Sequence, residues 1–172
     1  MRDSLVPGSR AAVRPTVGWV FTNLWRIVAF GFGSGLLRPA PGTWGTLLGW
    51  ALWVVLLQGR SDTVILAVLV VSFAIGCLAC ERTGRALGVP DHGGMVWDEI
   101  VAFWLVLWLT PNTLIAQALA FVIFRLFDIT KPQPARYFDK RLKGGFGVMF
   151  DDLIAAAYSL LVMAVLVTFG AL

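Results

Sequence analysis

Long apolar runs constrain this chain more than any other feature of its sequence. Hydrophobic residues make up 58% of the 172 residues and charged residues only 14%, and the mean hydropathy is +0.80. A soluble fold of this length has too little interior to bury so much apolar surface. The sequence therefore predicts an all-α, polytopic membrane helical bundle. Five apolar runs are the candidate membrane helices, some of them short or tilted for a bilayer: residues 44–57, 64–80, 100–109, 114–127 and 153–172.

The segments before the first run are rich in turn-forming residues. Residues 1–16 form a basic tail that we expect to be mobile, and residues 17–172 form a single membrane-embedded domain. Apolar side chains recur at helical spacing within residues 17–30, which predicts an interfacial amphipathic helix. Residues 31–46 contain five glycines and two prolines, so we expect a loop at the membrane surface. Three hydroxyl side chains of this loop could contact a lipid headgroup or cap the loop: Ser34, Thr43 and Thr46.

Two topologies fit the apolar runs, and they differ at Pro111-Asn112. This dipeptide is either a tight turn between two helices, giving five in all, or a kink within one helix, giving four. With the N-terminus inside, five helices place twelve Lys and Arg residues inside and only Arg60 outside, whereas four helices place seven inside and six outside. Because cytoplasmic loops carry an excess of Lys and Arg, we favour five helices.

The five-helix topology brings most acidic residues to the cytoplasmic interface. Nine of the ten acids fall there, the exception being Asp62. Carboxylates held close together repel one another unless a cation screens them. Oxygen ligands favour Mg²⁺, and a single His with two Cys excludes a zinc site rich in those residues. Acids at helix starts also fit simple stabilisation of the helix dipole. Five acids flank the last three runs: Asp98, Glu99, Asp128, Asp151 and Asp152.

Basic residues near the same interface could bind a phosphate group. Arg125, one turn before Asp128, is either an ion-pair partner of that carboxylate or a phosphate ligand. His92 is predicted to be a turn residue rather than a proton shuttle. The basic segment between the fourth and fifth runs could clamp phosphate or could serve only as a topology signal. Its candidate phosphate ligands are Lys131, Arg136, Lys140, Arg141 and Lys143.

The residues present restrict the chemistry of a phosphate reaction. Cys77 and Cys80 lie in an apolar run, where a thiolate is disfavoured, and neither precedes an arginine at the spacing that a cysteine phosphatase needs. The single histidine excludes a histidine-nucleophile lipid phosphatase, which needs more than one His, and there is no Asp-x-Asp motif. Metal-assisted attack by water remains, with attack by a carboxylate as the less favoured route.

Four segments resemble the phosphatidylglycerophosphatase A family and follow one another in the family's order: GFGSGLLRPAPGTWGT, VWDEIVAFW, FRLFDITKPQPARYFDK and GGFGVMFDDLIAA. The resemblance runs from about Gly31 to Ala156 and departs at Ala102, where a glycine often follows the acidic pair. Members of that family are membrane-bound, Mg²⁺-dependent phosphatases that convert phosphatidylglycerophosphate into phosphatidylglycerol and phosphate. The resemblance therefore implies a multi-pass enzyme of the bacterial cytoplasmic membrane, with Mg²⁺ as cofactor, a phospholipid as substrate and its active site facing the cytoplasm.

The resemblance also implies roles for the charged residues, while two other functions stay open. A small transporter or channel component would line an ion path with its acids, and a Mg²⁺-dependent phosphatidyl transferase would need an aspartate-rich helix pattern that is missing here. No nucleic acid is expected as a partner. The implied catalytic residues are Asp98, Glu99, Asp128 and Asp152; the implied metal ligands are Glu99, Asp128, Asp151 and Asp152; and the expected phosphate ligands are Arg125, Lys131, Arg136 and Lys143.

Overall fold

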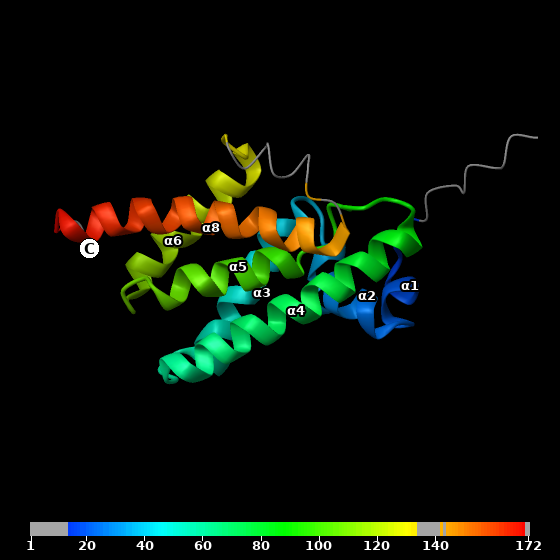
Figure 1. Ribbon diagram of the computed structural model, residues 1–172, viewed down its shortest axis with the longest axis horizontal. Helices are drawn as coiled ribbons and strands as arrows, with labels where there is room; N and C mark the ends of the chain where they lie inside the picture. Colours follow the sequence, from blue (N-terminus) through cyan, green and yellow to red (C-terminus); the bar gives the residue numbers. More distant parts are fainter. Residues whose placement is uncertain (1–13, 134–141, 143, 171–172) are drawn as a thin grey trace, which may run out of the picture.

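The computed structural model describes residues 14–133, 142 and 144–170, and every regular element among them is helical (Figure 1). The prediction of an all-α fold is confirmed for these residues. In chain order the elements are α1 (Val17–Phe21), α2 (Leu24–Ala29), the 3₁₀ segment η1 (Gly31–Leu36), α3 (Pro41–Leu52) with its π-helical continuation η2 (Trp53–Leu57), α4 (Asp62–Leu87), α5 (Trp97–Trp108), α6 (Leu114–Thr130) and α8 (Gly144–Thr168).

Two of these helices are long and apolar enough to cross a membrane. α4 has 26 residues and α8 has 25, and their most apolar windows reach hydropathies of 2.7 and 2.0. Only 33% of each window is buried inside the protein, so most of this apolar surface faces outward, which a helix inside a soluble core would not do. The segment Pro41–Leu57 is a shorter apolar helix. Membrane crossing by all five helical segments stays a prediction.

The chain breaks between α5 and α6, as the five-helix topology requires. α5 ends at Trp108, and Thr113 caps the start of α6 by accepting a hydrogen bond from the backbone N–H of Ala116 at 3.2 Å. Pro111 lies between the two helices and cannot donate a backbone hydrogen bond. The alternative of one kinked helix over residues 100–127 is therefore wrong.

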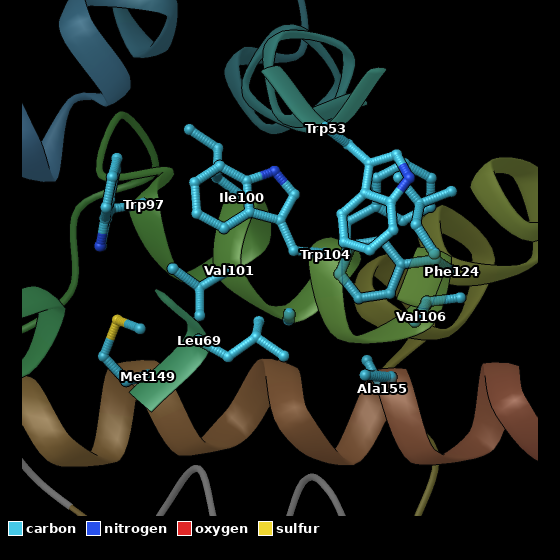
Figure 2. Packing of buried hydrophobic residues seen from close by; sticks show 14 of the residues in the cluster. Trp53, Leu69, Trp97, Ile100, Val101, Trp104, Val106, Phe124, Met149 and Ala155 are labelled. Carbon is cyan, nitrogen blue, oxygen red and sulfur yellow. The ribbon is translucent and has the colours of Figure 1, made fainter. Parts of the chain in front are cut away.

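α5 forms the centre of the molecule, between α3 and α8. Figure 2 shows its Trp97, Ile100, Val101, Trp104 and Val106 packed between these two neighbours. The indole N–H of Trp104 donates to the carbonyl of residue 49 in α3 at 2.8 Å, and that of Trp97 donates to the carbonyl of residue 72 in α4 at 3.0 Å. These bonds fix the rotation and height of α5, which carries Asp98 and Glu99 in its first turn.

The N-terminal segment differs from the predicted single helix over residues 17–30. It forms α1 and α2, which are separated at Thr22 and Asn23. The Asn23 side chain accepts a hydrogen bond from the backbone N–H of Trp25 at 3.0 Å and so starts a new helix. The prediction of one helix was wrong because this local bond competes with helix continuation. The interfacial position of the segment stays a prediction.

The predicted surface loop over residues 31–46 is also corrected. Gly31–Leu36 is a tight 3₁₀ segment, and α3 already begins at Pro41. Proline is well tolerated at the first helical position, because its missing N–H would have no helical partner there. Thr43 and Thr46 therefore lie on a helix instead of a loop.

α8 begins at Gly144, nine residues before the predicted apolar run starting at Leu153. The carboxylate of Glu81 in α4 accepts a hydrogen bond from the backbone N–H of Gly145 at 2.7 Å and caps the helix from outside. A Cβ atom at Gly145 would overlap the carbonyl of Cys77, so glycine permits this close contact between α4 and α8. Asp151 and Asp152 consequently lie in the third turn of α8, away from its start.

The indole bond that holds α5 to α3 gives a test of the core. Trp104→Phe should lower the free energy of unfolding by about 1–3 kcal/mol, because a buried hydrogen bond and part of a well-packed ring are lost. Thermal unfolding in detergent measures the effect. Trp44→Phe is the matched control, since its indole bond to the Pro39 carbonyl lies at a side chain that is 43% exposed, where water replaces it. Equal loss of stability in both variants would contradict this account.

Candidate active site

A pocket of about 380 Å³ opens where α5 begins, α6 ends and α8 passes them. The beginnings of α5 and α8 lie at the same side of the molecule in Figure 1. Residues between α4 and α5, among them Pro90 and Met95, complete the wall. The structure thus brings together the acids that the sequence places near the ends of three helices. Among the residues that the structure describes, the charged ones that line the pocket are Asp91, Asp98, Glu99, Asp128, Lys131, Asp151 and Asp152.

Three of these carboxylates converge on one point. Glu99, Asp128 and Asp152 each offer an oxygen, and the three oxygens lie within 4.8 Å of one another. Each residue comes from a different helix: α5, α6 and α8. Asp128 and Asp152 are buried, and the Glu99 side chain is only 14% exposed.

Arg125 approaches this cluster from the side of α3. Its Nη1 lies 2.6 Å from Oδ2 of Asp128 and 3.1 Å from Oε1 of Glu99, so one guanidinium nitrogen bridges two of the three carboxylates. The predicted i,i+3 ion pair with Asp128 is confirmed. Arg125 is not one of the described residues that line the pocket, although 12% of its side chain is exposed. It therefore sits behind the carboxylates as seen from the pocket.

α3 supplies the backing for this ion network. A Cβ atom at Gly42 would overlap the Glu99 carboxylate, so only glycine lets α3 approach so closely. Thr46 is fully buried; its hydroxyl donates to the carbonyl of Gly42 at 2.9 Å and accepts a hydrogen bond from Nη1 of Arg125 at 3.3 Å. Thr46 thus contacts Arg125 from a fully buried position, and its predicted headgroup contact stays a prediction.

Ser34 and Thr43 remain half-buried, and their contact with a headgroup stays a prediction. The Ser34 hydroxyl donates to the carbonyl of Gly31 at 2.8 Å, which is a local turn bond. His92 also has a turn role: its Nδ1 accepts a hydrogen bond from the backbone N–H of Gly94 at 3.0 Å.

Lys131 is the predicted phosphate ligand that the structure places in the pocket. It follows the last turn of α6, and its ammonium pairs with Oδ2 of Asp151. The other predicted phosphate ligands of this segment lie outside the described residues: Arg136, Lys140, Arg141 and Lys143.

Several carboxylate oxygens of the pocket are buried without a compensating partner among the described residues. Buried oxygens of Asp98, Glu99 and Asp152 have no hydrogen-bond partner among the described residues. Asp98 and Glu99 precede the apolar run of α5, and burial raises the pKa of Asp98 well above its usual range, with the Glu99 charge adding to it. Burial also raises the pKa of Glu99 to about 7, although the Arg125 charge opposes the rise. Such a group gains stability from a bound cation, and oxygen-only ligands suit a hard one.

Helix capping does not explain the second acidic pair. The dipole effect of a helix fades beyond its first turn. Asp151 and Asp152 lie in the third turn of α8, and the first turn of that helix holds no acid among its described residues. The alternative explanation therefore survives only for Asp98 and Glu99, which do lie in the first turn of α5.

The glycines in α3 have a packing role that the sequence patterns above did not predict. Gly42, Gly45 and Gly49 recur at spacings of three and four, which places them on one helix face. All three are buried, and they face the first turns of α5: a Cβ atom at Gly45 would crowd Val96, and one at Gly49 would contact Ile100. This spacing is the signal that could have predicted a close helix contact.

In the described part of the chain, the fold and the pocket define a helical protein with two apolar helices of membrane length and a buried carboxylate site. Comparison of the sequence with protein families identifies it more closely. The chain belongs to the phosphatidylglycerophosphatase A family, whose sequence model matches residues 27–167.

Individual relatives agree with this assignment. The chain is 47% identical to phosphatidylglycerophosphatase A of Haemophilus influenzae over 142 residues, which cover 82% of this chain and 87% of the relative. It is 40% identical to phosphatidylglycerophosphatase A of Escherichia coli over 139 residues, 80% of each chain. It is 38% identical to a Bacteroides thetaiotaomicron protein named "Putative phosphatidylinositol-3-phosphatase", over 81% of this chain and 91% of that one. No solved structure matches the chain.

Because α3 lies so close to Glu99, we expect the activity to be sensitive to substitution of Gly42. Gly42→Ala should lower kcat/KM for phosphatidylglycerophosphate by up to ~10²-fold, because the added methyl group must displace the Glu99 carboxylate. Phosphate release in detergent measures this. Gly18→Ala is the matched control, since a Cβ atom at this helical glycine meets nothing within 4 Å. Equal activity of the two variants would show that the position of Glu99 does not limit turnover.

Proposed function

We propose that this chain is a Mg²⁺-dependent lipid phosphatase that hydrolyses the terminal phosphomonoester of phosphatidylglycerophosphate. The observation that carries the proposal is the convergence of Glu99, Asp128 and Asp152 within 4.8 Å in a pocket that also contains Lys131. Membership in the phosphatidylglycerophosphatase A family supports the choice of reaction and of substrate.

The carboxylate cluster fits a magnesium ion. In proteins Mg²⁺ is usually bound through one or two carboxylates together with several waters and substrate phosphate. Glu99, Asp128 and Asp152 would hold it, and the unpartnered buried oxygens of Glu99 and Asp152 are suitable ligand atoms. When bound, the ion supplies positive charge that offsets the charge of the phosphoryl group and lowers the pKa of bound water.

The protein's own residues would then orient the reaction. Lys131 donates hydrogen bonds to the phosphate oxygens and neutralises part of their charge. Water attacks phosphorus and gives up a proton, the bond from phosphorus to the glycerol oxygen breaks, and the leaving glycerol oxygen takes up that proton to form the alcohol. Asp98 lines the pocket with an unpartnered buried oxygen and is either the base that receives the water proton or an additional ligand.

Arg125 acts in this scheme as a fixed counter-charge. Its Nη1 already bridges Glu99 and Asp128, and the pocket opens on the other side of these carboxylates. We therefore assign it to holding the two side chains in place, in preference to the phosphate contact that the sequence also allowed. A guanidinium suits this task because its planar donors keep a fixed geometry.

The membrane arrangement is part of the proposal. Five helical segments would cross or enter the bilayer, with the N-terminus and the pocket on the cytoplasmic side of a bacterial membrane. The apolar outward faces of α4 and α8 support contact with lipid, and the charge distribution of the loops supports the orientation. The lipid tails of the substrate would stay in the bilayer while its headgroup enters the pocket.

The other two functions lack a supporting observation. The acids gather in one pocket instead of following a path through the bundle, which does not fit a channel. The name of the Bacteroides relative raises a more specific alternative, a different phosphorylated headgroup. Phosphatidylinositol 3-phosphate should therefore be assayed beside phosphatidylglycerophosphate.

Metal removal and substitution of the cluster test the proposed function together. EDTA should abolish phosphate release from phosphatidylglycerophosphate, and Mg²⁺ should restore it. Glu99→Gln, Asp128→Asn and Asp152→Asn should each lower kcat by at least ~10²-fold, because each removes a negative charge that holds the ion. Asp62→Asn, at the far end of α4, is the control and should keep normal turnover. Full activity in EDTA, or in all three cluster variants, would refute the proposal.

The orientation is tested by labelling single cysteines in a chain whose Cys77 and Cys80 are replaced by Ser. Cysteines at Thr130 and at Gly93 should react with a membrane-impermeant reagent only from the cytoplasmic side, and one at Ser61 only from outside. All three positions are exposed, so their reaction reports the side of the membrane. Labelling of positions 93 and 130 from opposite sides would refute the topology.

A further inference from the structure

We propose that the adjacent acids Asp151 and Asp152 have different tasks: Asp152 faces the metal cluster, whereas Asp151 is a positioning residue that holds the Lys131 ammonium against the substrate phosphate. This inference rests on the proposed function and assigns separate roles to two residues of its site. The family resemblance, by contrast, implies that both acids are metal ligands.

Helix geometry separates the two carboxylates. Successive residues of an α-helix point about 100° apart around its axis, so the short side chains of Asp151 and Asp152 leave α8 in different directions. Asp152 points toward α5 and α6, where its oxygen lies within 4.8 Å of those of Glu99 and Asp128. Oδ2 of Asp151 instead accepts a hydrogen bond from Nζ of Lys131. α8 therefore presents one acid to the cluster and the other to a cation.

The Asp151–Lys131 pair is asymmetric in a way that suits phosphate binding. The Asp151 side chain is only 6% exposed, while that of Lys131 is 31% exposed, and both line the pocket. The acid is thus the more buried member of the pair, and the lysine side chain is the more accessible one. A lysine ammonium carries three N–H donors, so a bond to Asp151 is compatible with a bond to a phosphate oxygen.

Anchoring matters because lysine is a flexible side chain. Its charge sits at the end of four rotatable bonds, and a substrate that must first order it binds less well. Lys131 directly follows α6 with a φ of 41°, in the left-handed region, so its backbone is already turned out of the helix. A buried carboxylate one helix away then fixes the far end of the side chain. The result is a preorganised positive charge beside the metal cluster.

Four variants test this division: Asp151→Asn, Lys131→Met, their double variant, and Asp152→Asn. Two measurements are made on each detergent-solubilised protein. Titration with Mn²⁺ followed by electron paramagnetic resonance gives the metal Kd without substrate. Steady-state assays of a short-chain phosphatidylglycerophosphate at saturating Mg²⁺ give KM and kcat. Asp62→Asn serves as the control, because it makes the same chemical change at a residue that does not line the pocket. Asp62 lies at the start of α4, where its carboxylate accepts a hydrogen bond from the indole N–H of Trp108.

We expect the variants to fall into two groups, one that changes the affinity for metal and one that changes the KM for the substrate. Asp152→Asn should weaken Mn²⁺ binding at least ~10-fold, whereas Asp151→Asn and Lys131→Met should raise KM at least ~10-fold and keep the Mn²⁺ Kd within about threefold of the wild type. The double variant should be no worse than Lys131→Met alone, within a factor of about two, because Asp151 acts through Lys131.

Two results would overturn the inference alone: weakening of Mn²⁺ binding by Asp151→Asn as large as that by Asp152→Asn, or additive KM effects in the double variant. Failure of the proposed function has a different signature. A wild-type protein that neither binds Mn²⁺ nor releases phosphate from the lipid would refute the proposed function and this inference together.

Discussion

The structure depends on how an apolar helical protein accommodates buried negative charge. Six acids line one pocket, and the described cations that pair with them are Arg125 and Lys131. Burying an unpaired carboxylate is costly, so each such side chain must find a cation or hydrogen bonds. A single nitrogen of Arg125 forms ion pairs with two of the acids, and Lys131 forms an ion pair with a third. The charge that remains is the basis for proposing a metal ion in this pocket.

The same helix connects the hydrophobic core to that pocket. α5 packs between α3 and α8, and its indole bonds to backbone carbonyls of two neighbouring helices fix its rotation. Asp98 and Glu99 directly follow Trp97, so the packing of one aromatic ring sets the position of two carboxylates. α3 adds a second constraint, because its buried glycines allow its backbone to lie against Glu99. The packing of the core therefore also sets the geometry of the site, and for this reason we expect a methyl group at Gly42 to disturb it.

Sequence patterns and structure disagree mainly at helix starts. The glycine-rich segments around residues 41–46 and 144–147 look unsuited to helices, yet both are helical. In each case a distant group makes the helix possible. Glu81 of α4 caps the start of α8, and α3 gains from close packing against α5, which larger residues would prevent. Local propensity cannot include such partners, because they come from other parts of the chain.

The sequence by itself determined the helical, apolar character of the protein and the break at Pro111. It also placed its acids near the ends of three helices. These features follow from composition, hydrophobic run length and charge placement, which are properties of the chain alone. The tertiary structure decided which acids meet: Glu99, Asp128 and Asp152 converge, Asp151 turns to Lys131, and Arg125 faces inward with Thr46. The physical reason is that these contacts depend on the rotation of each helix about its axis, and that rotation is fixed only by packing against neighbouring helices.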